Sequence, residues 1–173
     1  GLGGGGGVVV EWVWGKGGGG VLHKVWNRQV REASAEISSP QRVLGEGPGG
    51  AFRILENGVC FEAGLSEGYS YGLFLDQRDN RRRLLTRHVA AKFGPCFEPG
   101  AEVLNAFAYT CGFSVGAARA GARVTSLDLS RNYLDWGRRN FALNGLEADA
   151  HEFIRGDVFD WLRRWGRKGR KFG

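Results

Sequence analysis

Short apolar runs alternate with helix-like stretches from residue 102 onward, and this order predicts a parallel β-sheet. The expected strands are EVLNAF (102–107), ARVTSLDL (122–129) and HEFIRG (151–156). The expected helices cover residues 112–120, 131–143 and 158–165. Strands that alternate with helices favour parallel pairing through right-handed crossovers. We therefore expect an α/β fold, a partial Rossmann-like parallel sheet that holds only some of the strands of a complete doubly wound sheet.

Turn and capping residues predict where several elements begin and end. In residues 51–63, two apolar-rich runs flank Asn57-Gly58, a dipeptide that suits the two-residue type I′ turn of a β-hairpin. Ser130 is expected to cap the helix 131–143, and Asn144-Gly145 to end it. A β-hairpin segment is therefore expected to precede the parallel sheet.

A basic helix is predicted between the hairpin and the sheet, at about residues 77–92. Asp76 looks like its N-cap, with Asp79 as a partner further along. Its apolar face is expected to consist of Leu84, Leu85, Val89 and Phe93. Much of the remaining surface would be covered by Arg78, Arg81, Arg82, Arg83 and Arg87.

Glycine dominates the beginning of the chain. The chain has 30 Gly in 173 residues, far above the roughly 7% that is usual, and much of the excess lies in residues 1–20. Because Gly-rich chain loses much entropy on ordering, these residues favour a linker or a poorly ordered edge. The alternative for Val8 to Trp14 is pairing as a strand. Residues 21–50 carry mixed signals and end in the loop GEGPGG.

Composition and charge narrow the possible partners. Hydrophobic residues make up 42% of the chain and charged residues 24%, which permits a buried core. The formal net charge of +6 favours a polyanionic partner such as nucleic acid, with a merely basic surface as the alternative. No run reaches the roughly 18 apolar residues of a membrane span, so no membrane partner is expected. The chain contains no Met, so we expect its numbering to begin inside a longer reading frame.

Cysteine and histidine residues carry no sign of a metal site or a nucleophilic centre. The cysteines are odd in number and lack metal-ligand spacing, which favours reduced thiols in an intracellular protein. The histidines form no cluster, so each is expected to be a surface or packing residue. These residues are Cys60, Cys96, Cys111, His23, His88 and His151.

Candidate binding residues follow the predicted strands, because open parallel sheets bind ligands beyond the carboxyl ends of their strands. The first strand ends at Asn105 and continues into AFAYTCGF, and Gly112 then opens a helix whose amides and positive end face the crevice. The dinucleotide fingerprint GxGxxG is absent from this loop, which disfavours a pyrophosphate ligand and with it a nucleotide-dependent oxidoreductase.

Two acidic residues end the next two strands. Asp128 is able to accept hydrogen bonds from both hydroxyls of a ribose, with a turn-forming role as the alternative. Asp157 is able to accept a hydrogen bond from an adenine amino group while Val158 or Phe159 packs on the ring. The alternative for Asp157 is a helix cap.

Several motifs together resemble one known family. VLNAFAYTCGFSVGAARAGA resembles motif I of the class I S-adenosylmethionine-dependent methyltransferases that modify 23S ribosomal RNA at cytosine C5 or guanine N7. VTSLDLS, RRNFALNGL and FIRGDVFDWLR follow in the family's order and at similar spacing. Upstream, ENGVCFEAGL and GLFLDQRDNRRRL are similar to the family's hairpin and to its next segment. The resemblance covers about residues 42–172.

The resemblance implies S-adenosylmethionine as the cofactor and assigns roles to individual residues. Asp128 would bind the ribose, Leu129 would lie beside the adenine, and Asp157 would hold the adenine amino group, with Val158 or its neighbour on the ring. The methionine part would be surrounded by Asn105, Phe107, Tyr109, Thr110 and Gly112. Gln77 and Arg78 would sit near the cofactor carboxylate, and the alternative for Arg78 is one more solvated arginine.

The chain also departs from the family pattern. Cys111 replaces the first Gly of the family's GG pair, so it would crowd the cofactor or require backbone adjustment if the position needs a positive φ. The family's DPP-type motif would lie beyond Gly173, so we expect no catalytic residue in this chain and no activity from it alone. Cys111 is not expected to be a nucleophile, because the family's cytosine chemistry uses a cysteine from a later motif.

The basic end of the chain has two open interpretations. Its cations would contact RNA phosphates, or they would form a solvated helix end, where positive charge is favoured. The residues are Arg163, Arg164, Arg167, Lys168, Arg170 and Lys171. Trp161 and Trp165, four residues apart, are expected to pack together.

The sequence therefore predicts a methyltransferase that acts on a base of large-subunit ribosomal RNA. The expected organisation is a Gly-rich, partly irregular segment 1–50, a hairpin and central segment 51–75, and the first half of the cofactor-binding domain in 76–173. The alternatives are a nucleotide-dependent oxidoreductase fragment and an inactive basic RNA-binding fragment. The expected location is intracellular: the cytoplasm of a bacterium, or a plastid or mitochondrion of a eukaryote.

Overall fold

The computed structural model describes residues 7–15, 18–26, 41–44, 50–64 and 71–172, and the side chains of the last two ranges. The chain divides into two compact units. One unit consists of residues 1–52 and 63–71, and the other of residues 53–62 and 72–173. Among the described residues, no helix has the length and apolar character needed to cross a membrane.

The first unit contains an antiparallel sheet of three strands in the order β1-β2-β3. The strands are β1 (Gly7–Gly15), β2 (Gly18–Trp26) and β3 (Gln41–Leu44). Val8 pairs with Val25, and the register continues to Gly15 opposite Gly18. For the run from Val8 to Trp14 the strand alternative therefore holds, and the linker interpretation is wrong there. His23 lies in β2, but its side chain lies outside the described residues.

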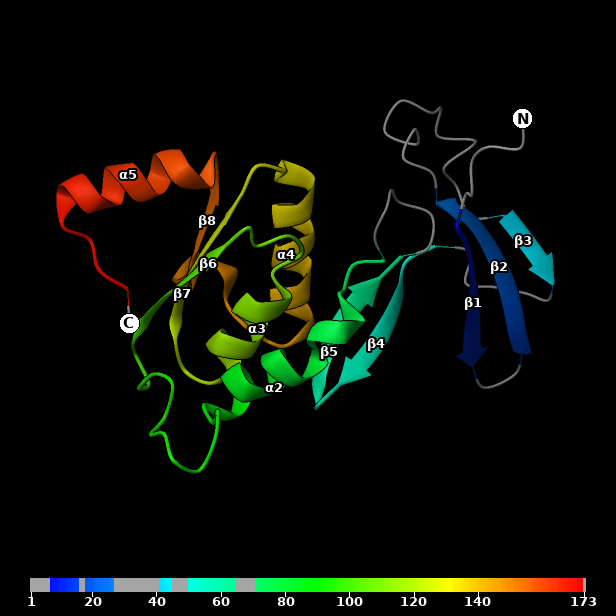
Figure 1. Ribbon diagram of the computed structural model, residues 1–173, viewed down its shortest axis with the longest axis horizontal. Helices are drawn as coiled ribbons and strands as arrows, with labels where there is room; N and C mark the ends of the chain where they lie inside the picture. The colour runs from blue at the N-terminus through cyan, green and yellow to red at the C-terminus, as the bar shows by residue number, and fades with distance from the viewer. Residues whose placement is uncertain (1–6, 16–17, 27–40, 45–49, 65–70, 173) are drawn as a thin grey trace. The chain divides into compact units, whose positions relative to one another are not determined.

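The second unit is built on a parallel sheet in the order β6-β7-β8, as the alternation of strands and helices predicted. The strands are β6 (Glu102–Ala106), β7 (Arg123–Asp128) and β8 (Glu152–Arg155). The helices that follow them are α3 (Gly112–Arg119), α4 (Arg131–Leu143) and α5 (Val158–Lys168), with a short 3-10 turn, η3 (Ala148–Ala150), before β8 (Figure 1). Ser130 caps α4 by accepting a hydrogen bond from the N–H of Tyr133, as expected.

Helices cover both faces of this sheet. One core cluster joins Val124 of β7 to Val115 of α3 and Phe141 of α4, and all three are almost fully buried. A second cluster joins Leu127 of β7 to Val158 and Trp165 of α5. Because side chains alternate along a strand, Val124 and Leu127 face opposite sides, so α5 lies across the sheet from α3 and α4.

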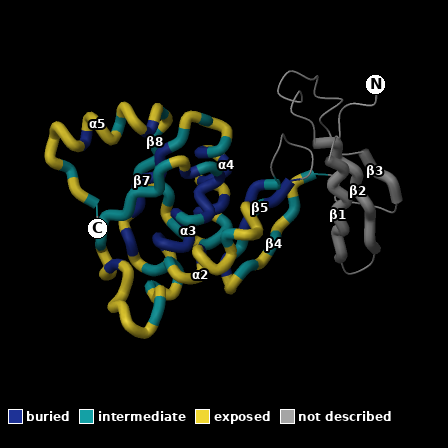
Figure 2. Tube along the Cα trace, viewed as in Figure 1, coloured by how far each residue is buried: buried dark blue, intermediate teal, exposed yellow. Residues whose placement is uncertain are grey.

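The predicted hairpin consists of β4 (Phe52–Glu56) and β5 (Val59–Ala63). Asn57 and Gly58 have φ values of 51° and 78°, so both turn residues are left-handed, as a type I′ turn requires. Val59 and Phe61 of β5 are buried and belong to the core cluster of α3 and α4, and Figure 2 shows buried stretches along β5. Residues 53–62 of the hairpin are therefore part of the second unit and contribute to its core.

The basic helix is shorter than predicted and has a different start. A 3-10 turn, η2 (Leu75–Gln77), leads into α2 (Arg78–Thr86). Asp76 lies inside η2 and accepts a hydrogen bond from the side chain of Gln77, so its prediction as N-cap is wrong. Arg87 has a left-handed φ of 55°, which ends the helix six residues before the predicted end at Lys92. Val89 and Phe93 are consequently exposed and form no buried helix face.

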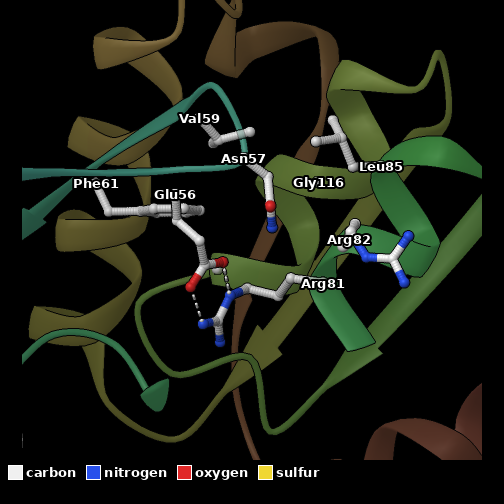
Figure 3. Close-up of a pocket in the computed structure, with 9 residues that line it drawn as sticks. Glu56, Asn57, Val59, Phe61, Arg81, Arg82, Leu85 and Gly116 are labelled. Carbon is white, nitrogen blue, oxygen red and sulfur yellow. Dashed lines mark hydrogen bonds and ion pairs between the residues drawn. The ribbon is translucent and has the colours of Figure 1, made fainter. Parts of the chain in front are cut away.

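Arg81 of α2 is buried, although it was predicted to belong to a solvated arginine surface. Its guanidinium makes two hydrogen bonds of 2.8 and 2.7 Å to the carboxylate of Glu56 in β4 (Figure 3). A third hydrogen bond of 2.8 Å joins it to the backbone O of Phe74. The side chains of Arg81 and Glu56 are 4% and 9% exposed. A buried charge needs such compensation, and the hairpin supplies it.

The end of the chain packs back onto the sheet. Trp161 and Trp165 of α5 have ring centroids 5.2 Å apart, which confirms the predicted packing. Arg170 donates to Thr125 of β7 at 3.1 Å and to Glu152 of β8 at 2.8 Å. Arg170 therefore binds the sheet, whereas the other five basic residues predicted to form the basic end are exposed: Arg163, Arg164, Arg167, Lys168 and Lys171.

Candidate cofactor-binding site

The two predicted acids follow adjacent strands at one edge of the parallel sheet. Asp128 ends β7 and pairs with Arg155, the last residue of β8. The N–H of Gly156 donates to the backbone O of Asp128 at 3.0 Å, and Asp157 comes next in the chain. The carboxyl ends of β7 and β8 thus bring the backbones of the two acids together.

Asp128 is half-buried and binds the loop that follows β6. Its Oδ2 accepts a hydrogen bond of 2.8 Å from the N–H of Tyr109, and its Oδ1 accepts one of 2.9 Å from the N–H of Ser130. Asp128 therefore stabilises the turn after β7, as the alternative interpretation predicted. Each carboxylate oxygen accepts about two hydrogen bonds, so this residue keeps capacity for further donors.

Asp157 is exposed and caps α5. Its Oδ1 accepts a hydrogen bond of 3.0 Å from the N–H of Asp160, so the helix-cap alternative holds. A carboxylate is able to accept about four hydrogen bonds, and capping uses one of them. Because Asp157 is exposed, its other acceptor positions are accessible from solvent. Val158, the first residue of α5, is 2% exposed and belongs to the core, whereas Phe159 is 59% exposed. Of these two neighbours, Phe159 is the one that a ligand at this edge can reach.

The loop between β6 and α3 holds three residues other than glycine in the left-handed region. Phe107, Tyr109 and Cys111 have φ values of 58°, 50° and 62°. The left-handed conformation costs a residue with a side chain roughly 1–2 kcal/mol. Such strain persists only where surrounding contacts hold it, and it is concentrated at functional sites. The sequence predicts that this loop, residues 107–111, contacts a cofactor, and it is therefore called the cofactor loop below.

For Cys111 the sequence predicts either crowding of the cofactor or an adjusted backbone with a positive φ, and the backbone is adjusted. Its positive φ confirms that this position needs the conformation that Gly adopts most easily. Its side chain is fully buried and lies against Gly137 of α4. Burial raises the pKa of the Cys111 thiol to about 12, so the thiol is neutral and is a poor nucleophile.

Tyr109 and Thr110 tie the cofactor loop to the segment before α2. The hydroxyl of Tyr109 accepts a hydrogen bond of 3.1 Å from the N–H of Gly72, and the hydroxyl of Thr110 donates to the carbonyl of the same glycine. The Tyr109 ring also lies 5.2 Å from the ring of Phe74 and 4.5 Å from that of Tyr133. The segment that leads to Gln77 and Arg78 therefore lies beside the cofactor loop.

Gln77 and Arg78 lie at the end of this segment, and among the described residues their side chains form no hydrogen bond or ion pair with the cofactor loop. The Gln77 amide donates to Asp76 and accepts from Asn80, and Arg78 is exposed at the first position of α2. The structure thus brings their segment beside the cofactor loop.

Asn105 and Gly112 flank the cofactor loop, one on each side of it in the chain. The Asn105 amide donates to the hydroxyl of Ser114 at 2.9 Å, and Ser114 is hydrogen-bonded to Ser126 at 2.8 Å. Gly112 is buried, and a Cβ at this position would come within 2.8 Å of Leu73. Asn105 therefore links β6 to α3 and, through Ser114, to β7, whereas Gly112 allows the start of α3 to pack closely against Leu73.

An exposed apolar side chain follows each strand of the parallel sheet. Phe107 after β6, Leu129 after β7 and Phe159 after β8 are 63%, 63% and 59% exposed. The rings of Phe107 and Phe159 lie 6.0 Å apart in an edge-to-face arrangement. This ring pair was not predicted, because Phe107 and Leu129 were predicted to be the last residues of strands and only Phe159, or Val158 beside it, to pack on a ring. Asn140, a buried amide of α4 that binds the cofactor loop, was not predicted either.

The fold and the strand-end acids define a Rossmann-like α/β protein, and comparison with known proteins places it further. The family model of S-adenosylmethionine-dependent methyltransferases matches residues 13–173. The chain therefore belongs to the S-adenosylmethionine-dependent methyltransferase family.

Two relatives are named as ribosomal RNA large subunit methyltransferases. The protein from Deinococcus radiodurans is 40% identical over 139 residues, which are 79% of this chain and 32% of that protein. Methyltransferase I from Aeromonas salmonicida is 42% identical over 131 residues, which are 75% of this chain and 31% of that protein. The chain spans about a third of the length of these curated relatives.

A solved structure has the same fold. A crystal structure complexed with SAH, of a protein assigned as a methyltransferase, aligns with a TM-score of 0.68 at 29% identity. The alignment covers 88% of this chain and 43% of that chain. This likeness confirms the predicted fold class, a partial Rossmann-like sheet preceded by a hairpin.

Proposed function

We propose that this chain forms the S-adenosylmethionine-binding part of a methyltransferase that modifies a base of large-subunit ribosomal RNA. The observation that carries the proposal is the composition of one sheet edge. There, two carboxylates and three exposed apolar side chains follow successive parallel strands. An adenosine needs apolar cover for its base and acceptors for its hydroxyl and amino groups, and this edge has both.

The side chains at this edge fit the adenosine part of the cofactor. Asp128 would accept hydrogen bonds from the ribose hydroxyls with the capacity that the Tyr109 and Ser130 amides leave. Asp157 would accept one from the adenine amino group. Leu129 and Phe159 would cover the adenine ring, while Val158 supports them from the core.

The cofactor loop would surround the methionine part. Phe107 and Tyr109 would line it with side chains, whereas the buried Thr110 and Gly112 would contribute backbone groups. Asn105 would hold the start of the loop through Ser114. Gln77 and Arg78 would bind the cofactor carboxylate from the segment that lies beside the loop.

A bound S-adenosylmethionine would supply a methyl group on a positively charged sulfur for attack by a nucleophilic atom of an RNA base. This chain's own residues would hold the donor in one orientation and cover its adenosine, which lowers the entropic cost of bringing the two reactants in line. We assign no catalytic residue within the chain.

RNA is the proposed substrate. The names of the relatives from Deinococcus radiodurans and Aeromonas salmonicida support it, and so does the net charge of +6. Five exposed cations at the end of α5 and beyond it would contact phosphates. The proposed location is inside the cell, in the compartment that holds large ribosomal RNA.

Calorimetric titration of the chain with SAH and, separately, with NADH tests the cofactor. We expect binding of SAH and no binding of NADH. The substitution Asp128→Asn should weaken SAH binding about tenfold or more, because hydrogen bonds to a charged acceptor contribute about 1.5–3 kcal/mol each. Asp149→Asn is the matched control, because Asp149 is fully exposed on η3.

The results separate the proposal from its alternatives. Binding of NADH without SAH would indicate an oxidoreductase fragment. Binding of ribosomal RNA with no affinity for either cofactor would indicate a basic RNA-binding fragment. In both cases the methyltransferase proposal would be wrong.

A further inference from the structure

Helix α4 binds the edge of strand β5 through three side chains spaced one helical turn apart. The indole N–H of Trp136 donates to the backbone O of Glu62 at 3.2 Å. The backbone N–H of Glu62 donates to Oδ1 of Asn140 at 2.8 Å. Asn144 accepts from the N–H of Cys60 at 2.9 Å and donates to its carbonyl at 2.7 Å. The helix thus satisfies backbone groups that a neighbouring strand would otherwise satisfy.

Asn140 differs from the other two because its amide also reaches the cofactor loop. Its Nδ2 donates a hydrogen bond of 2.9 Å to the carbonyl of Thr110, and the side chain is fully buried. The Nδ2 of Asn144 instead makes its further bond within α4, to the carbonyl of Asn140. Asn140 therefore joins the hairpin to the cofactor loop, whereas Asn144 joins the hairpin to α4 alone.

The Thr110 carbonyl, which Asn140 binds, belongs to the most strained part of the cofactor loop. Thr110 stands between Tyr109 and Cys111, both of which are left-handed. Rotation of the peptide between Thr110 and Cys111 would change ψ of the first residue and φ of the second. A donor on the Thr110 carbonyl opposes that rotation, and without it a buried carbonyl would lose its partner.

We propose that Asn140 is a positioning residue for the cofactor, a role that rests on the proposed function. Through the Thr110 carbonyl, it keeps the cofactor loop in the strained conformation that receives the methionine part. A positioning residue holds the groups that contact the ligand in the geometry that binding requires, but it does not contact the ligand itself. Through this hydrogen bond, α4 and the hairpin contribute to cofactor affinity, although neither Asn140 nor β5 lies at the carboxyl ends of the parallel strands.

Paired substitutions of the two asparagines test this role. Asn140→Ala and Asn144→Ala each remove hydrogen bonds to β5, but only the first removes the bond to the loop. Titration with SAH should show at least a tenfold rise in Kd for Asn140→Ala and less than a twofold change for Asn144→Ala. Denaturant unfolding of both variants measures the loss of stability, which both should share.

A spectroscopic measurement on the unmodified chain keeps the inference testable if Asn140→Ala does not fold. On addition of SAH, the side-chain amide resonances of Asn140 should shift in a nitrogen–proton correlation spectrum, and those of Asn144 should not. An absent shift at Asn140 would overturn the inference.

The remaining outcomes are distinct. Equal losses of affinity in the two alanine variants, or none in Asn140→Ala, would overturn the positioning role while the proposed function stands. If the unmodified chain itself fails to bind SAH, the proposed function fails and the positioning role fails with it.

Discussion

The thiol of Cys111 occupies the space that a side chain at position 137 would need. A Cβ on Gly137 would overlap the Cys111 sulfur and lie 2.8 Å from the Cys111 Cβ. Gly137 lies within α4, where glycine is ordinarily unfavourable, and Cys111 lies in the left-handed region, where cysteine is unfavourable. The two local costs are therefore coupled through one packing contact between α4 and the cofactor loop.

This contact predicts that the effect of Gly137→Ala changes sign with the residue at position 111. In the natural chain, the added methyl group should destabilise the fold by about 1–3 kcal/mol through overpacking. In a Cys111→Gly background, the same substitution should be neutral or stabilising by up to about 1 kcal/mol, because alanine is the better helix former. A double-mutant cycle of urea unfolding measures the coupling. Additive effects of the two substitutions would contradict it.

The cysteines should differ strongly in reactivity. Cys96 is exposed, whereas Cys111 is buried and its pKa is raised to about 12, so little thiolate forms at Cys111 near neutral pH. Brief treatment with iodoacetamide at pH 8 should modify Cys96 first and leave Cys111 unmodified until the chain is unfolded in urea. Peptide mass spectrometry identifies the sites. Modification of native Cys111 at the rate of Cys96 would show that the loop opens readily.

The buried ion pair between Arg81 and Glu56 should be important for stability. Arg81→Ala leaves the Glu56 carboxylate buried without its partner, and we expect a loss of about 3–5 kcal/mol in the free energy of unfolding. Arg82→Ala is the matched control, because the ion pair of Arg82 with Asp79 is exposed and should contribute less than about 1 kcal/mol. Chemical denaturation compares the variants, and equal losses would show that Arg81 is not effectively buried.

His151 should make stability depend on pH below about 6.5, the ordinary value for histidine. Its Nδ1 accepts a hydrogen bond of 3.1 Å from the N–H of Val124, which requires the neutral ring. Burial, and then the positive charge of Arg123, lower the pKa of His151 in the folded state. The unfolded chain therefore binds a proton first as the pH falls, and the contribution of His151 is lost through that range.

Urea unfolding at pH 7.5 and pH 5.5 measures this dependence. The natural chain should lose more stability between these two pH values than His151→Phe, which cannot titrate. The variant is expected to be less stable at pH 7.5, because Val124 loses its acceptor. An identical pH dependence in the two proteins would assign the effect to other groups.

Features that depend on residues close together in the chain were predictable from the sequence. The type I′ turn at Asn57-Gly58, the Ser130 cap and the order of strands and helices follow from local backbone preferences and from the periodicity of apolar residues. The positions of Asp128 and Asp157 at strand ends follow from the same order, because parallel strands end at a common edge. Those features were predictable without knowing what packs against what.

The partners of individual polar side chains, by contrast, depend on the folded chain. Arg81 looked like one of several solvated arginines until the fold brought it to Glu56, 25 residues away. Asn140 gained its role from Glu62, 78 residues away, and from Thr110, 30 residues away. Burial and pairing of a polar group depend on partners that folding brings together from distant parts of the chain, and a local sequence pattern does not identify those partners.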